Sequence, residues 1–526
     1  MIARRLCALV AGLALGALGL VVGNTHAAFT SPSGNAANSY DVAPDFVAPS
    51  VVRTRAADPA YGPTYAVRQC RFYRAYAEVS DDGSPPSGVA SVVANLTALT
   101  AGLGADSLIA GSYSLDGLTY GWRSLPRLAT ASAGSYGYDL TSTDAAANAR
   151  VEGDYPVSVS ANNAAVAAVF LTGLEQGVAS STAPGVFTAV TGAGVSADAA
   201  NPRYGSYSLR TAPANAAANA SVTLTGSGNT VAVRFAVRLS ALPGSTVNLF
   251  AVVPSAGNTA FLAYDSATGR LGVRWGTGAI INAASAAASG TWYVIEMRVI
   301  TTNPRTIEWR IDGLDQTQAS SAETAGNVNG LIWGTTATNV TYTANFDDAI
   351  ASRTSGDYPI GNGKVLALAP NGMATHLNPT RFQEDDNTAI DANTWNRLDE
   401  IPATSTSDYV KQVSTGNTSY IGLTFADTAE TCINAVSGLV AYHSSAAGTN
   451  VGKTSIFNGS TENIIYSGTM GVTALGYKRA MVSAGAGAWT TAMLNALIAR
   501  VGYSSDVSPV PYWDALLLEY DVPINW

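Results

Sequence analysis

The sequence predicts an all-β protein made of tandem β-sandwiches, with very little helix. Three observations support this. Residues 292–313 alternate apolar and charged side chains with the period of two that a sheet with one dry face requires. Short apolar runs bounded by Asp-Gly or Pro turns recur along most of the chain. Gly, Ala, Ser and Thr dominate while charged residues make up only 12%, which suits short strands better than long salt-bridged helices.

Residues 292–313 carry the clearest pair of strands. One parity of the first half is apolar and holds Tyr293, Ile295, Met297 and Val299. The Asn303-Pro304 pair interrupts the run, and Asp312-Gly313 supplies the positive φ of a tight hairpin turn. The structural core that we predict from this stretch comprises Trp292, Trp309, Ile311 and Gly313.

The first 27 residues have the layout of a secretory signal peptide. A basic start, MIARR, precedes the apolar run LCALVAGLALGALGLVVG, and small residues lead to a cleavage point after Ala27 or Ala28. An uncleaved N-terminal anchor is the alternative, because the run is nearly long enough to span a bilayer. No later stretch is apolar enough to do so. We therefore expect an exported mature chain, secreted or at the cell surface, with no membrane span after removal of the leader.

The remaining chain is too long for one core and predicts three domains, at 58–160, 167–357 and 361–526. Residues 28–57 are rich in Pro, Ala, Ser and Asn without periodicity, which predicts a linker or an extended arm. Cys70 and Cys432 would need two domains to meet before they could pair, so we expect two buried or idle thiols. The net charge of -9 argues against a nucleic-acid partner.

The first predicted domain, 58–160, consists of short strands with turns at the spacing of a seven-strand sandwich. One strand is expected at 72–79, and 113–120 contains a central Asp-Gly turn. The runs GVASVVANLTAL and YDLTSTDAAANA resemble the immunoglobulin-like modules that are repeated in bacterial surface proteins. That resemblance implies a spacer or presentation role.

The second predicted domain, 167–357, adds a half-buried strand at 231–239, in which Arg234 and Arg238 alternate with apolar residues. It also has a hairpin whose loop is 265–269. The succession resembles laminin-G-like and concanavalin A-like jelly rolls. The residues that carry this resemblance are Gly205-x-Tyr207-x-Leu209-Arg210, Trp292-Tyr293, Trp309-Arg310-Ile311-Asp312-Gly313 and Phe346-Asp347-Asp348. The resemblance implies a fold, and it leaves the ligand open.

The third predicted domain, 361–526, contains a series of short strands and one amphipathic helix, expected at 489–499 with Thr490 as its N-cap. The continuous apolar residues 515–518 predict a central strand, 512–522, that is buried on both faces. The segments SGDYPIG, ARVGYSSDV and YWDALLLEYDV are similar to paired jelly-roll domains of phage tail and other virion-surface proteins.

We find no catalytic motif. Concanavalin A-like glycoside hydrolases resemble one another in a Glu-x-Asp-x-Glu strand, whereas Arg310 stands at the middle position of the stretch Glu308–Asp312. Glu308 opposite Arg298, or Glu296 opposite Arg310, is more simply a solvated cross-strand pair. No Gly-x-Ser-x-Gly elbow is present.

Two acidic stretches are candidates for a Ca²⁺ site, because carboxylate oxygens are the ligands this ion prefers. One is Asp347-Asp348 at the end of a strand. The other follows residue 383, and its candidate ligands are Asp385, Asp386 and Asp391. Simple solvation of acidic loops is the alternative for both. The two histidines beyond the leader are too few for a zinc site.

Sugar binding on such scaffolds uses exposed aromatic rings with a few polar groups beside them. The candidate ligand-binding residues are Trp333, Trp395 and Trp513. Burial in the core is the alternative for each of them. Trp275 shares the parity of Leu271 and Val273, which favours the core for it as well.

We therefore expect an exported, non-catalytic surface-recognition protein that binds glycans or mediates adhesion through its jelly-roll domains. A structural subunit of a virion or phage tail, whose sandwiches pack against further copies in a homo-oligomer, is the first alternative. A polysaccharide-active hydrolase is the second alternative, and it requires a carboxylate pair formed by residues distant in sequence.

Overall fold

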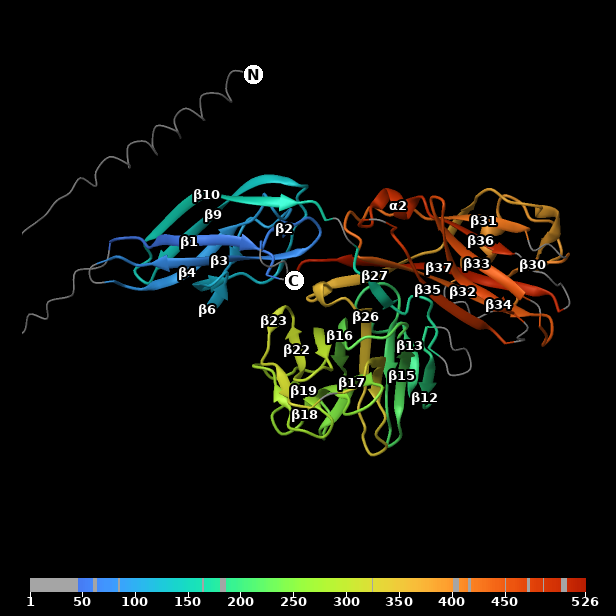
Figure 1. Cartoon of the computed structure of the whole chain (residues 1–526), viewed down its shortest axis with the longest axis horizontal. Helices are drawn as coiled ribbons and strands as arrows, with labels where there is room; N and C mark the ends of the chain where they lie inside the picture. The colour runs from blue at the N-terminus through green and yellow to red at the C-terminus, as the bar shows by residue number, and fades with distance from the viewer. Residues whose placement is uncertain are drawn as a thin grey trace, which may run out of the picture. The chain divides into compact units, whose positions relative to one another are not determined.

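The computed structural model builds nearly all of its regular structure from β-strands (Figure 1), which confirms the predicted class of tandem β-sandwiches. It describes residues 46–526 except 60–63, 84–85, 163–164, 180–185, 324, 401–405, 415–417, 450, 471–473, 486 and 503–508. The predicted signal peptide and the predicted arm up to residue 45 lie outside the described residues. Within the described part, no helix combines the length and the apolar character of a membrane span.

The first sandwich packs two five-stranded sheets around one apolar core. One sheet runs β1 (Ser50–Ala57), β3 (Phe72–Ser80), β7 (Leu118–Arg123) and β6 (Ile109–Leu115), with β8 (Arg127–Leu128) paired to β3. The other runs β2 (Val67–Arg68), β10 (Ala149–Ser160), β9 (Gly134–Asp144), β4 (Val89–Asn95) and β5 (Asp106–Ser107).

The end of the predicted linker is a strand, so the prediction was wrong for residues 50–57. This segment is β1, which pairs antiparallel with β3 along its whole length. Its composition lacks the period-two pattern of a half-buried strand, yet Ala56 and Ala57 are buried. The backbone hydrogen bonds of an edge strand need no apolar face, and a sequence pattern therefore misses such a strand.

The second sandwich joins a nine-stranded sheet to a seven-stranded sheet (green to yellow in Figure 1). The larger sheet runs β13 (Val195–Asp198), β14 (Ser208–Thr211), β26 (Ala344–Ser352), β16 (Thr230–Leu239), β21 (Trp292–Ile300), β22 (Arg305–Ile311) and β23 (Leu314–Asp315), with β11 (Ala168–Thr172) beside β26 and β24 (Ala319–Ser321) beside β22. The smaller runs β12 (Ala189–Thr191), β15 (Ala218–Thr223), β25 (Val328–Thr335), β17 (Val247–Pro254), β18 (Ala260–Asp265), β19 (Arg270–Trp275) and β20 (Ile281–Asn282).

The predicted strand pair at 292–313 is confirmed as β21 and β22. Ile295 lies opposite Ile311, and Trp309 is 1% exposed in the core. The turn residues Asp312 and Gly313 have φ values of 48° and 76°, as a two-residue hairpin requires. Trp292 was wrongly assigned to the core. It is half-buried because it shares the parity of Glu296. Side chains of that parity lie on the other face of the sheet from Ile295.

The two predicted cross-strand charge pairs have different environments. Arg298 and Glu308 form an ion pair at 2.5 Å and remain partly exposed. Glu296 lies opposite Arg310 in the register, but its side chain is buried and accepts a hydrogen bond from the backbone N–H of Gly361 at 2.6 Å. The prediction that this second pair is solvated was therefore wrong, because the chain that follows β26 covers it.

The third sandwich again packs two sheets against each other. One sheet runs β29 (Phe382–Glu384), β30 (Val410–Gln412), β37 (Pro511–Pro523), β32 (Ala435–Ser444) and β35 (Gly476–Val482), with β27 (Gly363–Leu368) paired to β37. The other runs β28 (Pro370–Met373), β31 (Tyr420–Phe425), β36 (Ile498–Gly502), β33 (Val451–Asn458) and β34 (Thr461–Thr469).

Strand β37 is central and buried on both faces, as predicted. Leu516 and Leu518 belong to the core of the third sandwich, whereas Ala515 and Leu517 belong to the cluster that fills the second sandwich. The predicted helix is much shorter than expected. It is α2 (Thr491–Asn495), where the Thr490 hydroxyl accepts a hydrogen bond from the Met493 N–H at 3.1 Å. The following apolar residues form β36 instead, because they pair with β31 and β33.

Charged residues join the second and third sandwiches. Residues Phe46–Trp526 form a single compact unit. Arg234 of β16 and Asp521 of β37 are both fully buried and form an ion pair at 2.6 Å. The alternation that predicted a half-exposed Arg234 is present, but Asp521 of β37 pairs with Arg234 on this face of β16 and the arginine is buried. The Asn434 side chain donates a further hydrogen bond to Asp521 at 2.8 Å.

A disulfide joins Cys70 to Cys432, so the expectation of two idle thiols was wrong. Cys70 lies between β2 and β3 of the first sandwich, and Cys432 precedes β32 of the third. The sequence separation of 362 residues gave no reason to expect them together. The link constrains a very long segment of chain, which lowers the conformational entropy of the unfolded state.

Glu175, which follows β11, is a buried carboxyl beside Glu519 of β37. Its Oε2 accepts a hydrogen bond from the Ser206 N–H at 2.8 Å, while its own backbone N–H donates to Glu519 Oε1 at 3.0 Å. Its Oε1 has no hydrogen-bond partner among the described residues. Burial, together with the neighbouring charge of Glu519, raises the pKa of Glu175 to about 8.

This pKa predicts a pH dependence of stability. Because the folded pKa of Glu175 lies above its ordinary value of 4.5, the native state holds the proton more tightly, and stability falls as pH rises from 4.5 to about 8. The substitution Glu175→Gln removes the charge. It should reduce the pH-dependent decrease in the free energy of unfolding by on the order of 3 kcal/mol. Urea unfolding at pH 5 and pH 8.5 measures the effect, with Glu308→Gln as a partly exposed control. If the difference in unfolding free energy between variant and wild type is the same at both pH values, Glu175 is already ionised in the native protein at pH 5.

Candidate functional site

A cluster of aromatic, basic and acidic side chains lies at one end of the β30–β37–β32 sheet. The register places Lys411, Tyr512 and His443 side by side on one rung. Residues on one rung of an antiparallel sheet share a face, and adjacent rungs alternate. The next rung, made of Val410, Trp513 and Tyr442, therefore faces the core of the third sandwich, where all three are buried.

Two tyrosines form the aromatic part of this cluster. The rings of Tyr409 and Tyr512 stack with centroids 4.3 Å apart and an angle of 17° between their planes. The His443 ring meets Tyr512 edge-on at 4.5 Å. Both tyrosines are only half-buried, so part of each ring remains open to solvent. The pair is a rigid apolar surface with hydroxyl groups at its border.

His443 is positioned by a buried carboxylate. Its Nδ1 lies 2.8 Å from the Asp514 carboxylate, which is almost fully buried. Burial raises the pKa of Asp514, and the hydrogen bond from His443 partly opposes that shift. Asp514 is next to Trp513 at a β-bulge, where the register with β32 shifts. The bulge thus brings the carboxylate beneath the imidazole and fixes the orientation of the ring.

Arg397 holds a group of acidic side chains beside the tyrosines. It lies in a 3₁₀ turn, η3 (Thr394–Arg397), and its Nε is 3.0 Å from Glu384. Asp385 and Asp408 lie 3.4 Å and 3.3 Å from the same guanidinium. The hydrogen bond with Glu384 raises the pKa of Arg397, ahead of the neighbouring carboxylate charges. Arg397 thereby neutralises part of an otherwise strongly negative patch.

The predicted calcium ligands form only part of a cluster. Glu384, Asp385 and Asp386 can bring one oxygen each within 4.8 Å of one another. Asp391 is used differently, because its carboxylate accepts a hydrogen bond from the Asn393 N–H at 2.6 Å. A Ca²⁺ ion needs six to eight oxygen ligands, whereas a guanidinium already contacts these three carboxylates. The acidic cluster therefore fits Ca²⁺ poorly while Arg397 is in place. The other acidic candidate, Asp348, is buried in an ion pair with Arg203 at 2.7 Å.

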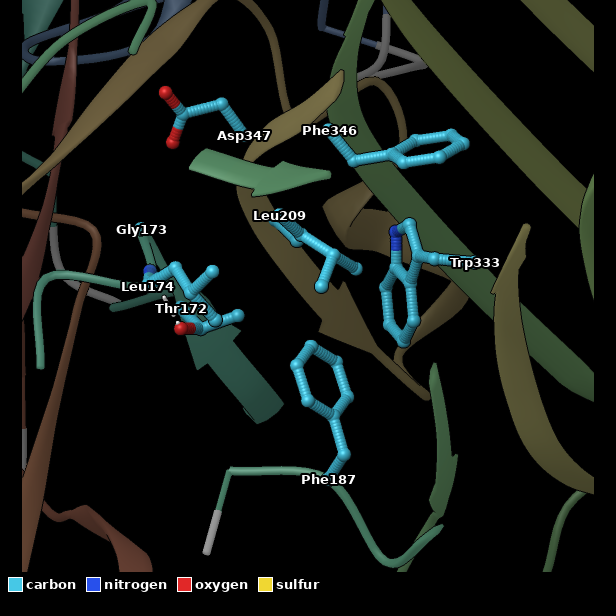
Figure 2. A pocket seen from close by; sticks show the side chains of 9 residues that line it. Thr172, Gly173, Leu174, Phe187, Leu209, Trp333, Phe346 and Asp347 are labelled. Atoms are coloured by element: carbon cyan, nitrogen blue, oxygen red, sulfur yellow. Dashed lines mark hydrogen bonds between the residues drawn. The ribbon is translucent and has the colours of Figure 1, made fainter. Parts of the chain in front are cut away.

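Two of the three predicted ligand-binding tryptophans are buried in the core and cannot stack on a ligand. Trp513 is fully buried, and Trp333 is 1% exposed. Figure 2 shows Trp333, Leu209 and Phe187 around a small internal cavity. That cavity has a volume of about 10 Å³, which is too little for a sugar. Trp395 is half-buried in η3 and packs against the core of the third sandwich.

The side chains that form the cluster were not predicted from the sequence. They are Tyr409, Tyr512, His443, Asp514 and Arg397. The available signal was the parity of β37: once Trp513 is placed in the core, Tyr512 must face outward. The three strands were predicted separately, and their pairing depends on contacts that a local pattern does not contain.

No protein-family model and no curated protein matches the chain. Similar solved structures include a conserved carbohydrate esterase from the Shiga toxin-encoding bacteriophage phi24B, with 13% identity and a TM-score of 0.30 over 36% of this chain and all of that one. Domain 4 of AbnA, a GH43 arabinanase from Geobacillus stearothermophilus, has 13% identity and a TM-score of 0.26 over 36% of this chain and 94% of that one. The carbohydrate binding module CBM66 from Bacillus subtilis has 11% identity and a TM-score of 0.22 over 30% and 95%.

These neighbours are carbohydrate-related proteins by their descriptions. With TM-scores of 0.30 and below, they carry no argument about the ligand of this chain. The resemblances to immunoglobulin-like, laminin-G-like and virion-surface domains stay predictions.

Proposed function

We propose that the chain is an exported surface-recognition protein and that its third sandwich binds a glycan at the Tyr409–Tyr512 pair. The observation that carries this proposal is the stacked, half-exposed tyrosine pair, with Lys411 and His443 beside it and Arg397 paired to Asp408, the residue before Tyr409. A sugar ring has an apolar C–H face and a polar edge of hydroxyl groups. The tyrosine rings match the first, and the polar side chains around them match the second.

The charge of the site favours a neutral glycan. Lys411 and Arg397 are each engaged by protein groups, Asn387 in the first case and four carboxylates in the second. The four carboxylates around Arg397 would repel a polyanion at this site, whereas neutral hydroxyl groups gain acceptors.

We further propose that the site is non-catalytic. Glycoside hydrolysis needs one carboxyl group to donate a proton and a second to act on the sugar. In this cluster Asp514 is held by His443, and Arg397 binds Glu384 and Asp408. Release of reducing ends from a polysaccharide by the purified chain would overturn this part of the proposal.

A virion or tail subunit remains the alternative from a different class, and one observation favours it. The hairpin of β6 and β7 lies at an edge of the first sandwich, and β6 is the last strand of its sheet. Ile109 and Leu118 on this hairpin are 41% and 43% exposed. An edge strand with exposed apolar side chains is a surface on which a second copy can pair.

The glycan proposal predicts the effect of one substitution. Tyr512→Ala removes half of the stacked pair and should weaken binding about tenfold, which corresponds to roughly 1.4 kcal/mol. A glycan array identifies the ligand, and isothermal titration of wild type and variant measures the loss.

Tyr204→Ala is the control, because it removes an exposed tyrosine from the second sandwich. Absence of any bound glycan, together with a large assembly in light scattering, would favour the virion alternative. Equal affinity of the Tyr512→Ala variant would show that the glycan binds elsewhere.

The acidic cluster predicts a second result. With Arg397 in place, Ca²⁺ should leave the melting temperature unchanged. Arg397→Gln frees three carboxylates from the guanidinium, and Ca²⁺ should therefore raise the melting temperature of this variant. Thermal unfolding with CaCl₂ or with EDTA checks both statements. Arg298→Gln, which removes an arginine from a pair with one carboxylate, is the control. Stabilisation of the wild type by Ca²⁺ would contradict our account of this cluster.

A further inference from the structure

A groove of about 490 Å³ lies at the rim of the second sandwich, away from the tyrosine cluster. The ends of β19 and β22 and the strand β24 form it, so both sheets of the sandwich contribute. Small, hydroxyl and amide side chains dominate its lining. The residues that the argument uses are Trp275, Arg305, Asn258, Ser320 and Glu323.

A buried arginine is the unusual feature of this groove. Arg305 is only 3% exposed, and its guanidinium lies over the Trp275 ring at 4.7 Å from the centroid. It forms an ion pair with Glu323, whose side chain is 64% exposed. The Nε and Nη1 atoms of Arg305 and the Nε1 atom of Trp275 are buried without a hydrogen-bond partner among the described residues.

Arg305 determines which ligand chemistry fits. Its Nε and Nη1 atoms are donors without a described partner, which is costly for buried groups. A ligand that brings a carboxylate to Nη2, the atom that Glu323 contacts, adds a compensating negative charge, and hydrogen bonds between arginine and a carboxylate are among the strongest in proteins. The hydroxyl and amide groups of Asn258, Ser320 and their neighbours add partners for the hydroxyl groups of a sugar.

Glu323 now occupies the position of such a ligand. Its carboxylate contacts Nη2 of Arg305, and Asn258 donates a hydrogen bond to it at 3.4 Å. An ion pair with so exposed a partner contributes little stability, so its exchange for another carboxylate costs little. The carboxylate of an incoming acid can therefore displace the Glu323 side chain from Arg305.

We propose that this groove binds an acidic sugar, with the sugar's carboxylate replacing Glu323 on Arg305. The inference extends the proposed glycan binding to a second site with the opposite charge preference. Neutral sugars bind at the tyrosine pair of the third sandwich, and a uronic or sialic acid unit binds at the rim of the second.

Trigalacturonic acid and its methyl ester test the proposal by isothermal titration with the full chain. The free acid should bind at least about tenfold more tightly than the neutral ester, because only the acid forms the charged contact with Arg305. Glu323→Gln removes the competing carboxylate and should tighten binding of the acid by about three- to tenfold. Arg305→Gln should abolish the preference for the acid. Glu308→Gln, which removes a carboxylate from another ion pair of the same sandwich, should change nothing.

Arg305 is buried, so its variant is judged only if its circular dichroism and melting temperature match those of a folded protein. Glu323 is exposed, and its variant tests the proposal in either case. Equal binding of acid and ester, or no effect of Glu323→Gln, would overturn the inference.

Two further probes test whether the ligand group that binds is a carboxylate or a sulfate. Binding of 3′-sialyllactose supports a carboxylate site, whereas binding of sulfated lactose alone would overturn the assignment of a carboxylate. If no acidic probe binds while Tyr512 still governs a neutral glycan, this inference fails and the proposed function stands. If no glycan of either kind binds, both fail.

Discussion

The buried ion pair between Arg234 and Asp521 is the interaction on which the arrangement of the second and third sandwiches depends. Both side chains have lost all contact with water, and the desolvation of two charges is expensive unless each finds its partner. The guanidinium also donates to the Asp348 carbonyl at 2.8 Å, and Asn434 donates to the carboxylate. Separation of the two sandwiches would leave these groups without partners, so the pair fixes β16 against β37.

This constraint also organises the candidate site. Asp521 and Tyr512 lie near opposite ends of β37, the strand that both sandwiches bury. The end with Asp521 is held by charge, and the other end carries the Lys411–Tyr512–His443 rung. A binding surface built on an anchored central strand keeps its aromatic rings in place before a ligand arrives, which lowers the entropy lost on binding.

Local patterns predicted the strands and turns well, because period-two alternation and Asp-Gly pairs are properties of neighbouring residues. The pair β21–β22, the hairpin before β23 and the buried β37 follow from such patterns. Patterns failed where the partner lies far along the chain. The Cys70–Cys432 bond, the burial of Arg234 and the outward position of Tyr512 each depend on a register or a packing contact between distant segments. Size and hydrophobicity favoured Trp513 as a ligand-binding residue, and for the same reason it fills the core.

The coupling energy between Arg234 and Asp521 tests this account most directly. Unfolding free energies of Arg234→Met, Asp521→Asn and the double variant form a double-mutant cycle. We expect each single variant to lose about 3–5 kcal/mol, because it leaves an unpaired buried group, and the double variant to lose clearly less than the sum. Losses that add to within about 0.5 kcal/mol would show that the two side chains do not meet in solution, and the second and third sandwiches would then be independent.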